Sequence, residues 1–177
     1  MRYASIRTMD ISNGPGIRVS IFVSGCGFHC PGCFNDEAQD FDFGKTYTEK
    51  TEETLVDLVA RPQIVGLSIL GGDPLWQNNE GIESLTRLCK RVHSIGKTVW
   101  IWSGFKWEEL FDVPRADISS LHEPLRKLIE QCDVFVDGRY VEKLKDYRLK
   151  WRGSSNQRVI DVKKSLEAKS PVLVEDT

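Results

Sequence analysis

Three cysteines stand close together near the start of the chain, at Cys26, Cys30 and Cys33, in the spacing C-x3-C-x2-C. Thiolate sulfur is a soft ligand that suits iron–sulfur clusters, zinc or copper(I). A four-iron cluster usually takes four protein thiolates, one for each iron, so three thiolates leave one iron with a free position. Open positions are typical of reactive metal sites, whereas structural sites are closed by protein ligands. The cysteines therefore predict a reactive metal centre.

Two less reactive interpretations of the cysteines are open. A disulfide is disfavoured, because the N-terminus lacks the apolar core of a signal peptide and the chain is expected to be cytoplasmic, where thiols stay reduced. A structural zinc could be completed by His29, which would make the chain a metal-stabilised binding module. Zinc ligands, however, more often come as two short groups separated by a longer span. Cys89 and Cys132 stand apart from the others and are expected to be ordinary buried residues.

The stretches that must position the cysteines alternate between strand and helix patterns. Four apolar runs predict strands, at 17–23, 64–70, 97–102 and 133–138. Amphipathic or capped stretches predict helices, from Thr48 or Thr51 to about 60, and at 81–93, 107–111 and 121–131. This order predicts an α/β fold with right-handed βαβ units and a parallel sheet.

Residues with chemical potential follow each predicted strand. They are the cysteine segment 26–33, the turn 71–73, Ser103 and Asp137. Because the carboxyl ends of parallel strands meet at one edge of the sheet, we expect these residues to share one site. A full eight-stranded barrel typically takes about 250 residues, so a chain of 177 residues predicts only a small, partial parallel (β/α) barrel that is open on one side.

The cysteine spacing, with Phe28 two residues before the second cysteine, resembles the signature of the radical S-adenosylmethionine (SAM) enzymes. Residues 13–18 (Asn-Gly-Pro-Gly-Ile-Arg) resemble the opening of the activating enzymes of glycyl-radical enzymes, although alone they read as a plain turn. Residues 151–158 are similar to the end of one group among these, the activating proteins of anaerobic ribonucleoside-triphosphate reductases. The resemblance extends from about Asp10 to Val162.

This resemblance implies the partial barrel of radical SAM enzymes and two cofactors, a [4Fe-4S] cluster and SAM. The cluster would be held by Cys26, Cys30 and Cys33. The residues that would contact SAM are Gly32, Cys33, Phe34, Gly71, Gly72 and Asp73. The wider superfamily often has Glu in place of Asp73, so the resemblance assigns no role to this side chain. It does imply that the backbone of Gly71 and Gly72 contacts SAM. No protein side chain is singled out as catalytic.

The implied activity is that of an oxidoreductase that cleaves SAM reductively. The resulting 5′-deoxyadenosyl radical would take hydrogen from a glycine of the large catalytic subunit of an anaerobic ribonucleoside-triphosphate reductase. Reduced flavodoxin or a similar donor would supply the electron, and the complex could hold two copies of each chain. Activation of another glycyl-radical enzyme, or radical chemistry on a small molecule, stays open as an alternative.

Composition limits the other function classes. The net charge of −2 gives no global field for nucleic acid, and no apolar run approaches the roughly 18 residues of a membrane span. The length and the 40% hydrophobic content favour a single domain, 1–177. Its last part, 139–177, is basic over 139–169 and is either a solvated face or a docking segment. Trp and Arg are frequent interface anchors, so residues 151–158 are predicted to help dock the partner.

Overall fold

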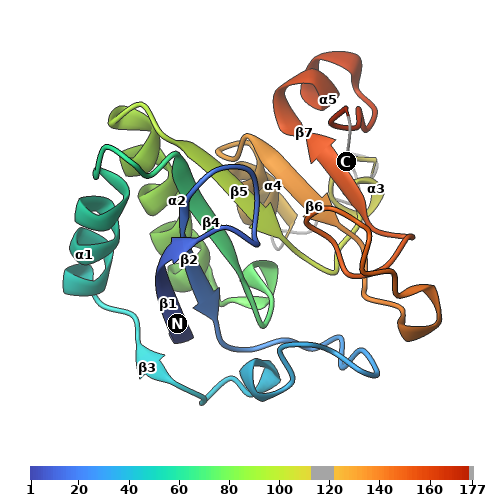
Figure 1. Ribbon diagram of the computed structural model, residues 1–177, viewed down its shortest axis with the longest axis horizontal. Coiled ribbons are helices and arrows are strands. Elements are labelled where there is room, and N and C mark those ends of the chain that lie inside the picture. The colour runs from blue at the N-terminus through green and yellow to red at the C-terminus, as the bar shows by residue number, and fades with distance from the viewer. Residues whose placement is uncertain (113–121, 176–177) are drawn as a thin grey trace.

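The structure is a computed structural model that describes residues 1–112 and 122–175. Its described strands form one seven-stranded sheet in the order β3-β1-β2-β4-β5-β6-β7 (Figure 1). The strands are β1 (Arg2–Asp10), β2 (Arg18–Val23), β3 (Lys45–Thr46), β4 (Gly66–Gly71), β5 (Thr98–Trp102), β6 (Val134–Asp137) and β7 (Arg158–Asp161). The α-helices are α1 (Glu49–Val59), α2 (Asn79–Ser94), α3 (Trp107–Phe111), α4 (His122–Ile129) and α5 (Val162–Ala168). Short 3₁₀ helices are η1 (Glu37–Gln39), η2 (Pro74–Trp76) and η4 (Glu142–Leu144).

The four central strands, β2, β4, β5 and β6, run parallel, as predicted. Parallel neighbours need a long crossover connection, and α1, α2 and the α3–α4 region lie in these connections. The predicted strands and helices are found within two residues of their expected bounds. The expected start of the α4 helix, Leu121, lies outside the described residues.

The prediction of a purely parallel sheet was wrong at both edges. Strand β1 is antiparallel to β2, β3 is antiparallel to β1, and β7 is antiparallel to β6. Strand β1 is only partly buried and mixes polar with apolar residues, while β7 has four residues in a basic stretch, so neither has the apolar run that indicates a strand. The fold is a mixed α/β fold, and its sheet ends at β3 and β7 without closing.

The main hydrophobic core lies between one face of the sheet and the helices. Alternate residues of the central strands point to this side, and all five described α-helices contribute to it. Buried representatives from four strands are Ile21, Ile69, Ile101 and Phe135. Burial of this apolar surface supplies the largest favourable term of folding and holds the strand ends in a fixed order.

The opposite face carries polar residues near the amino end of the strands. Arg18 is fully buried there and donates hydrogen bonds to Ser68 Oγ (2.8 Å), Leu67 O (2.7 Å) and Thr98 Oγ1 (3.0 Å). The loop between β1 and β2 arches in front of the strands (Figure 1), and Gly14, at φ +108°, lies against the Arg18 side chain. A Cβ on Gly14 would stand 2.8 Å from Arg18 Cδ. Residues 13–18 therefore form a turn that covers a buried arginine, at the end of β2 away from the cysteines.

A buried carboxylate joins α1 to α2. Glu52 is 1% exposed, and its oxygens accept hydrogen bonds from Arg87 Nη2 (2.8 Å) and Arg91 Nη1 (3.0 Å). Burial opposes the ionisation of Glu52, but the two guanidinium groups outweigh it and hold the pKa below its usual value. The pair differs from a surface salt bridge, since its acid is removed from water.

We predict that Glu52→Gln lowers the free energy of unfolding of the metal-free protein by about 2 kcal/mol at pH 7, less than for a fully buried pair because both arginines are partly exposed. The folded pKa lies below the unfolded value of about 4.3, so this stabilisation is present above that value. It is lost as the pH falls through the folded pKa. Urea unfolding at pH 7 and at acid pH measures both effects.

The matched control is Glu53→Gln, which removes the same charge from an exposed position of the same helix. It should change the free energy of unfolding by less than about 0.5 kcal/mol. Equal losses in the two variants would show that charge, and not the buried contact, is responsible.

Candidate metal centre

The three cysteines lie in the loop that follows β2, at the carboxyl end of the parallel strands. In Figure 1 this loop runs along the lower edge of the sheet toward the segment between β6 and β7. All three thiols are free, with Cys26 buried and Cys30 and Cys33 partly exposed. A turn brings Cys33 N to 3.1 Å from Cys30 O, and Cys26 N donates to Gln39 O (3.0 Å). The predicted ligands therefore share one compact loop.

Burial and neighbouring negative charges shift the pKa values of two of the thiols. Burial raises the pKa of Cys26 to about 11, and the negative charges of Asp73, Cys30 and Cys33 act in the same direction. Burial and the Cys33 charge likewise raise the pKa of Cys30. Metal-free Cys26 is thus protonated at neutral pH, and a metal that binds there must displace the proton.

The zinc interpretation needs a single metal ion held by His29 and the three cysteines. Within residues 1–112 and 122–175, no three His, Cys, Asp or Glu side chains converge in a way that could hold one metal ion. His29, the fourth ligand of the zinc interpretation, has its Nδ1 3.0 Å from Gln39 Oε1. A cluster takes one thiolate for each iron, so its ligands surround a group of atoms and not one point. The three thiols are soft ligands of the kind that iron–sulfur clusters and zinc both accept.

The predicted glycine turn after β4 packs against the start of the cysteine loop. Gly72 N donates to Val23 O (2.7 Å) and Asp73 N donates to Gly25 O (2.8 Å). A Cβ on Gly72 would lie 2.6 Å from Gly25 O and 2.5 Å from Ala38 O, so only glycine fits here. Gly71 has φ +114°, in the region that favours glycine. The two glycines allow the turn and the loop to approach closely.

Asp73 joins the tips of β4 and β5. It is 2% exposed, and its oxygens accept hydrogen bonds from Leu75 N (2.8 Å), Ser103 Oγ (2.9 Å) and Gly104 N (2.7 Å). Burial raises the pKa of Asp73 to about 6, although these donors oppose the rise. The prediction that residues 71–73 and Ser103 meet is therefore confirmed.

Asp137, the fourth predicted tip residue, makes its hydrogen bond and its ion pair with α3 and β7 and not with the cysteine loop. Its Oδ2 accepts a hydrogen bond from Trp107 N (2.8 Å), and it pairs with Arg158 of β7. Arg158 also binds Glu108, and these two carboxylates raise its pKa. Asp137 thus belongs to an ion-pair network that fastens α3 and β7 to β6.

An aromatic cluster beside the cysteines was not predicted. Phe28 lies 5.6 Å from Trp76 and 5.0 Å from Phe105, measured between ring centroids. The Phe28 ring also covers Gly104, where a Cβ would approach it to 2.5 Å. The sequence indicated only that Phe28 belongs to the cysteine motif. Its partners, Trp76 and Phe105, follow two other strands and lie far from it in the sequence. These aromatic contacts hold the middle of the cysteine loop in place.

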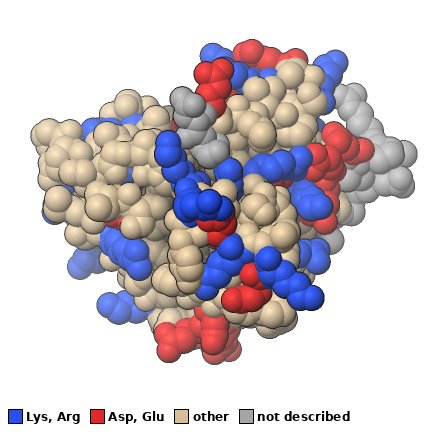
Figure 2. Space-filling model, turned by 45° about the vertical axis from the view of Figure 1, so that its right-hand side comes forward, with Lys and Arg blue, Asp and Glu red and all other residues tan. Residues whose placement is uncertain are grey.

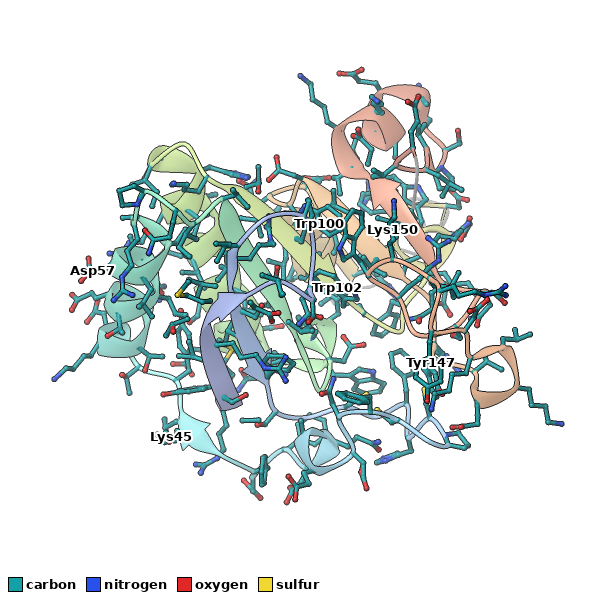
Figure 3. All side chains as sticks on the ribbon, viewed as in Figure 1. Lys45, Asp57, Trp100, Trp102, Tyr147 and Lys150 are labelled. Atoms are coloured by element: carbon teal, nitrogen blue, oxygen red, sulfur yellow. The ribbon has the colours of Figure 1, made fainter. Side chains whose placement is uncertain are left out.

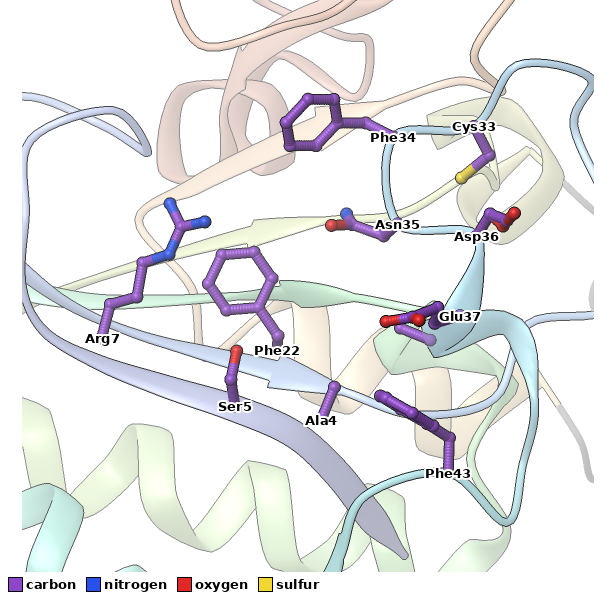
Figure 4. A pocket seen from close by; sticks show the side chains of 11 residues that line it. Ala4, Ser5, Arg7, Phe22, Cys33, Phe34, Asn35, Asp36, Glu37 and Phe43 are labelled. Carbon is purple, nitrogen blue, oxygen red and sulfur yellow. The ribbon is translucent and has the colours of Figure 1, made fainter.

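A cavity of about 490 Å³ opens beside Cys33 (Figure 4). Residues of β1 and β2 form one side of it, and the stretch that follows Cys33 forms the other. The lining residues are Ala4, Ser5, Arg7, Phe22, Cys33, Phe34, Asn35, Asp36, Glu37, Ala38 and Phe43. Phe34 is 94% exposed. The volume lies within the usual range of small-molecule sites, about 300–1,000 Å³.

Residues 151–158 pack on the molecule itself. Trp151, at φ +60°, has its ring centroid 5.1 Å from that of Trp100, and its carbonyl accepts a hydrogen bond from Trp102 Nε1 (2.7 Å). Figure 3 shows Trp100 and Trp102 on the sheet, with Tyr147 and Lys150 on the segment between β6 and β7. Trp151 and Arg158 therefore already have partners within the chain.

Residues 12–160 match a family described as "4Fe-4S single cluster domain". The anaerobic ribonucleoside-triphosphate reductase-activating protein of Salmonella typhimurium is 37% identical, over 90% of this chain and 97% of that protein. The proteins of the same name from Escherichia coli K12 (36%, over 90% and 97%) and Enterobacteria phage T4 (37%, over 90% and 93%) are also similar.

The chain belongs to the family of anaerobic ribonucleoside-triphosphate reductase-activating proteins. This assignment confirms the resemblance that the cysteine spacing and residues 151–158 indicated, and it favours iron–sulfur over zinc. Within residues 1–112 and 122–175, no helix is both long and apolar enough to cross a membrane.

We predict that Asp73→Asn destabilises the metal-free protein by about 1–3 kcal/mol, because one carboxylate acceptor is replaced by an amide donor that faces backbone N–H groups. Urea unfolding followed by circular dichroism measures the loss. Asp57→Asn, at an exposed site on α1 (Figure 3), is the control and should leave the midpoint unchanged. An unchanged midpoint for Asp73→Asn would mean that this carboxylate does not join the strand tips.

Proposed function

We propose that this chain is an iron–sulfur oxidoreductase that activates an anaerobic ribonucleoside-triphosphate reductase by forming a glycyl radical on it. The observation that carries the proposal is the set of three free thiols in one loop of a chain that matches the 4Fe-4S family. Cys26, Cys30 and Cys33 hold a [4Fe-4S] cluster and leave one iron for SAM. When bound, the cluster supplies the electron for the reductive cleavage of SAM, which yields the radical that takes hydrogen from a glycine of the reductase.

The protein contributes a rigid seat for the cluster. The Gly71–Asp73 turn and the Phe28 aromatic cluster fix the cysteine loop at its start and in its middle. The carboxylate oxygens of Asp73 accept hydrogen bonds from Leu75, Ser103 and Gly104. Its contribution to a SAM site is therefore through the backbone of the turn.

SAM is proposed to bind next to Cys33. The cavity there has a volume suited to a ligand of this size, and its wall includes the residues that follow the last cysteine. Phe34 lines the cavity, and the Gly71–Gly72 turn is hydrogen-bonded to the start of the loop that carries Gly32 and Cys33. The cavity wall offers both apolar and polar side chains to such a ligand.

Residues 1–177 act as one domain with the partial barrel of radical SAM enzymes, and the reductase covers the open side. Residues 139–177 take part in docking through their exposed side chains. On the face shown in Figure 2, Lys and Arg are interspersed with Asp and Glu, so docking depends on local complementarity and not on one basic surface. Reduced flavodoxin or a similar donor delivers the electron, and two copies of each chain could assemble.

The test is anaerobic reconstitution with iron and sulfide, followed by reaction with SAM, dithionite and the large reductase subunit. Cys26→Ala, Cys30→Ala and Cys33→Ala should each lose the cluster absorption and reduce the glycyl radical, measured by electron paramagnetic resonance, by at least about 100-fold. Cys89→Ala, outside the loop, should keep both. A cysteine-loop variant that still forms the glycyl radical at the parental rate would refute the proposal, and a radical formed only on another glycyl-radical enzyme would reassign the substrate.

A further inference from the structure

Strand β1 has an outer edge that is paired only at its beginning. One side of β1 is hydrogen-bonded to β2. On the other side, β3 pairs with Arg2 and Tyr3 alone, and Gly44 packs against the carbonyl of Tyr3. Within residues 1–112 and 122–175, no backbone hydrogen bond joins the outer edge of residues 5–9 to another segment. This stretch of β1 therefore presents unpaired N–H and C=O groups.

The opposite edge of the sheet is covered by the chain itself. Asp161 N donates a hydrogen bond to Val172 O (2.9 Å), and Val174 N donates one to Val159 O (2.9 Å). The outer side of β7 is thus paired with residues 172–174. Strand β1 has no comparable cover over residues 5–9 in the part of the chain that the structure describes.

The open stretch of β1 lacks most of the features that protect an edge strand. Such edges normally carry proline or several charged side chains, or are very short. Residues 5–9 (Ser-Ile-Arg-Thr-Met) contain no proline and one charged residue, Arg7, and all of them except Ile6 are exposed. Pairing with β2 is regular over Ser5–Arg7, which keeps the backbone extended there. An extended segment of another chain can add to such an edge through its main chain.

The open edge runs beside the cavity next to Cys33. Ala4, Ser5 and Arg7 line this cavity, and Figure 4 shows their side chains on β1, on the other side of the cavity from Cys33. The Arg7 guanidinium lies 4.7 Å from the centroid of the Phe22 ring, which also lines the cavity. A strand added to β1 would lie about 4.8 Å from it, and every second residue would face the same side of the sheet as the cavity.

We propose that the glycine-bearing segment of the reductase binds as an extended strand along residues 5–9 of β1, with its glycine facing the cavity beside Cys33. The inference rests on the proposed function, which places SAM in this cavity. The hydrogen atom moves from the glycine Cα to the 5′ carbon of the deoxyadenosyl radical, so the two carbons must come within about 3.5 Å of each other. Backbone pairing holds the segment at this edge, and the missing Cβ of glycine allows the close approach.

Hydrogen–deuterium exchange of the reconstituted protein, with and without the intact large reductase subunit, tests where the segment binds. Amides of residues 5–9 that face outward should exchange at least about 10-fold more slowly in the complex, because they become hydrogen-bonded. The amides of α1, which are bonded within the helix, are the control and should not change. A complex in which residues 5–9 exchange as they do in the free protein would overturn the inference.

Two synthetic peptides with the sequence around the reductase glycine test how the segment binds. Each is N-methylated at every second residue, one at one alternate set and one at the other, with the glycine left unmethylated. Only alternate residues of an added strand turn their N–H groups toward the neighbouring strand. One peptide should therefore bind at least about 10-fold more weakly than the unmethylated peptide, and the other within about twofold of it.

The peptides change while the protein does not, so the comparison does not depend on the folding of a variant. Equal affinities of the two methylated peptides would overturn the inference, since backbone pairing requires a difference between them. A glycyl radical that forms while residues 5–9 stay unprotected would overturn this inference alone. Absence of a glycyl radical from the complete mixture of cluster-loaded protein, SAM, dithionite and reductase would instead refute the proposed function.

Discussion

The site depends on the contact between the cysteine loop and the turn after β4. Between β2 and η1 the loop has no regular secondary structure, so its shape must come from contacts with other parts of the chain. The hydrogen bonds from Gly72 and Asp73 to Val23 and Gly25 supply this constraint where the loop begins. Asp73, which follows β4, accepts a hydrogen bond from Ser103 and so ties the end of β4 to the end of β5. The sheet's parallel centre therefore matters chiefly because it brings these tips together.

The parallel centre of the fold and its metal ligands could be predicted from local patterns. Apolar runs specify buried strands, and three close cysteines specify a soft metal site, whatever the rest of the chain does. Thr48 or Thr51 could be predicted to cap a helix, and in the structure Thr48 is the cap and forms a capping box with Thr51. The antiparallel edges could not be predicted in this way, since β1 gains its strand form from pairing with β2 and has no strong apolar alternation of its own.

The contacts around the cysteines were also beyond local reasoning, because each joins residues far apart in sequence. Nothing near Phe28 indicates that Trp76, Phe105 and Arg139 surround it. Trp151 was predicted as an anchor for a partner because its residue type is common in interfaces. In the fold it packs on Trp100, so the same residue type serves an internal contact. Docking by residues 139–177 stays a prediction for their exposed side chains.

The central claim is that three thiolates hold a four-iron cluster with one iron left open for a ligand. Mössbauer spectroscopy of the iron-57-reconstituted protein, with and without SAM, tests it most directly. The account predicts a four-iron cluster in which a single iron changes its spectrum when SAM is added, while the other three stay as they were. Four equivalent irons that do not respond to SAM, or a protein that binds zinc and no cluster, would contradict it.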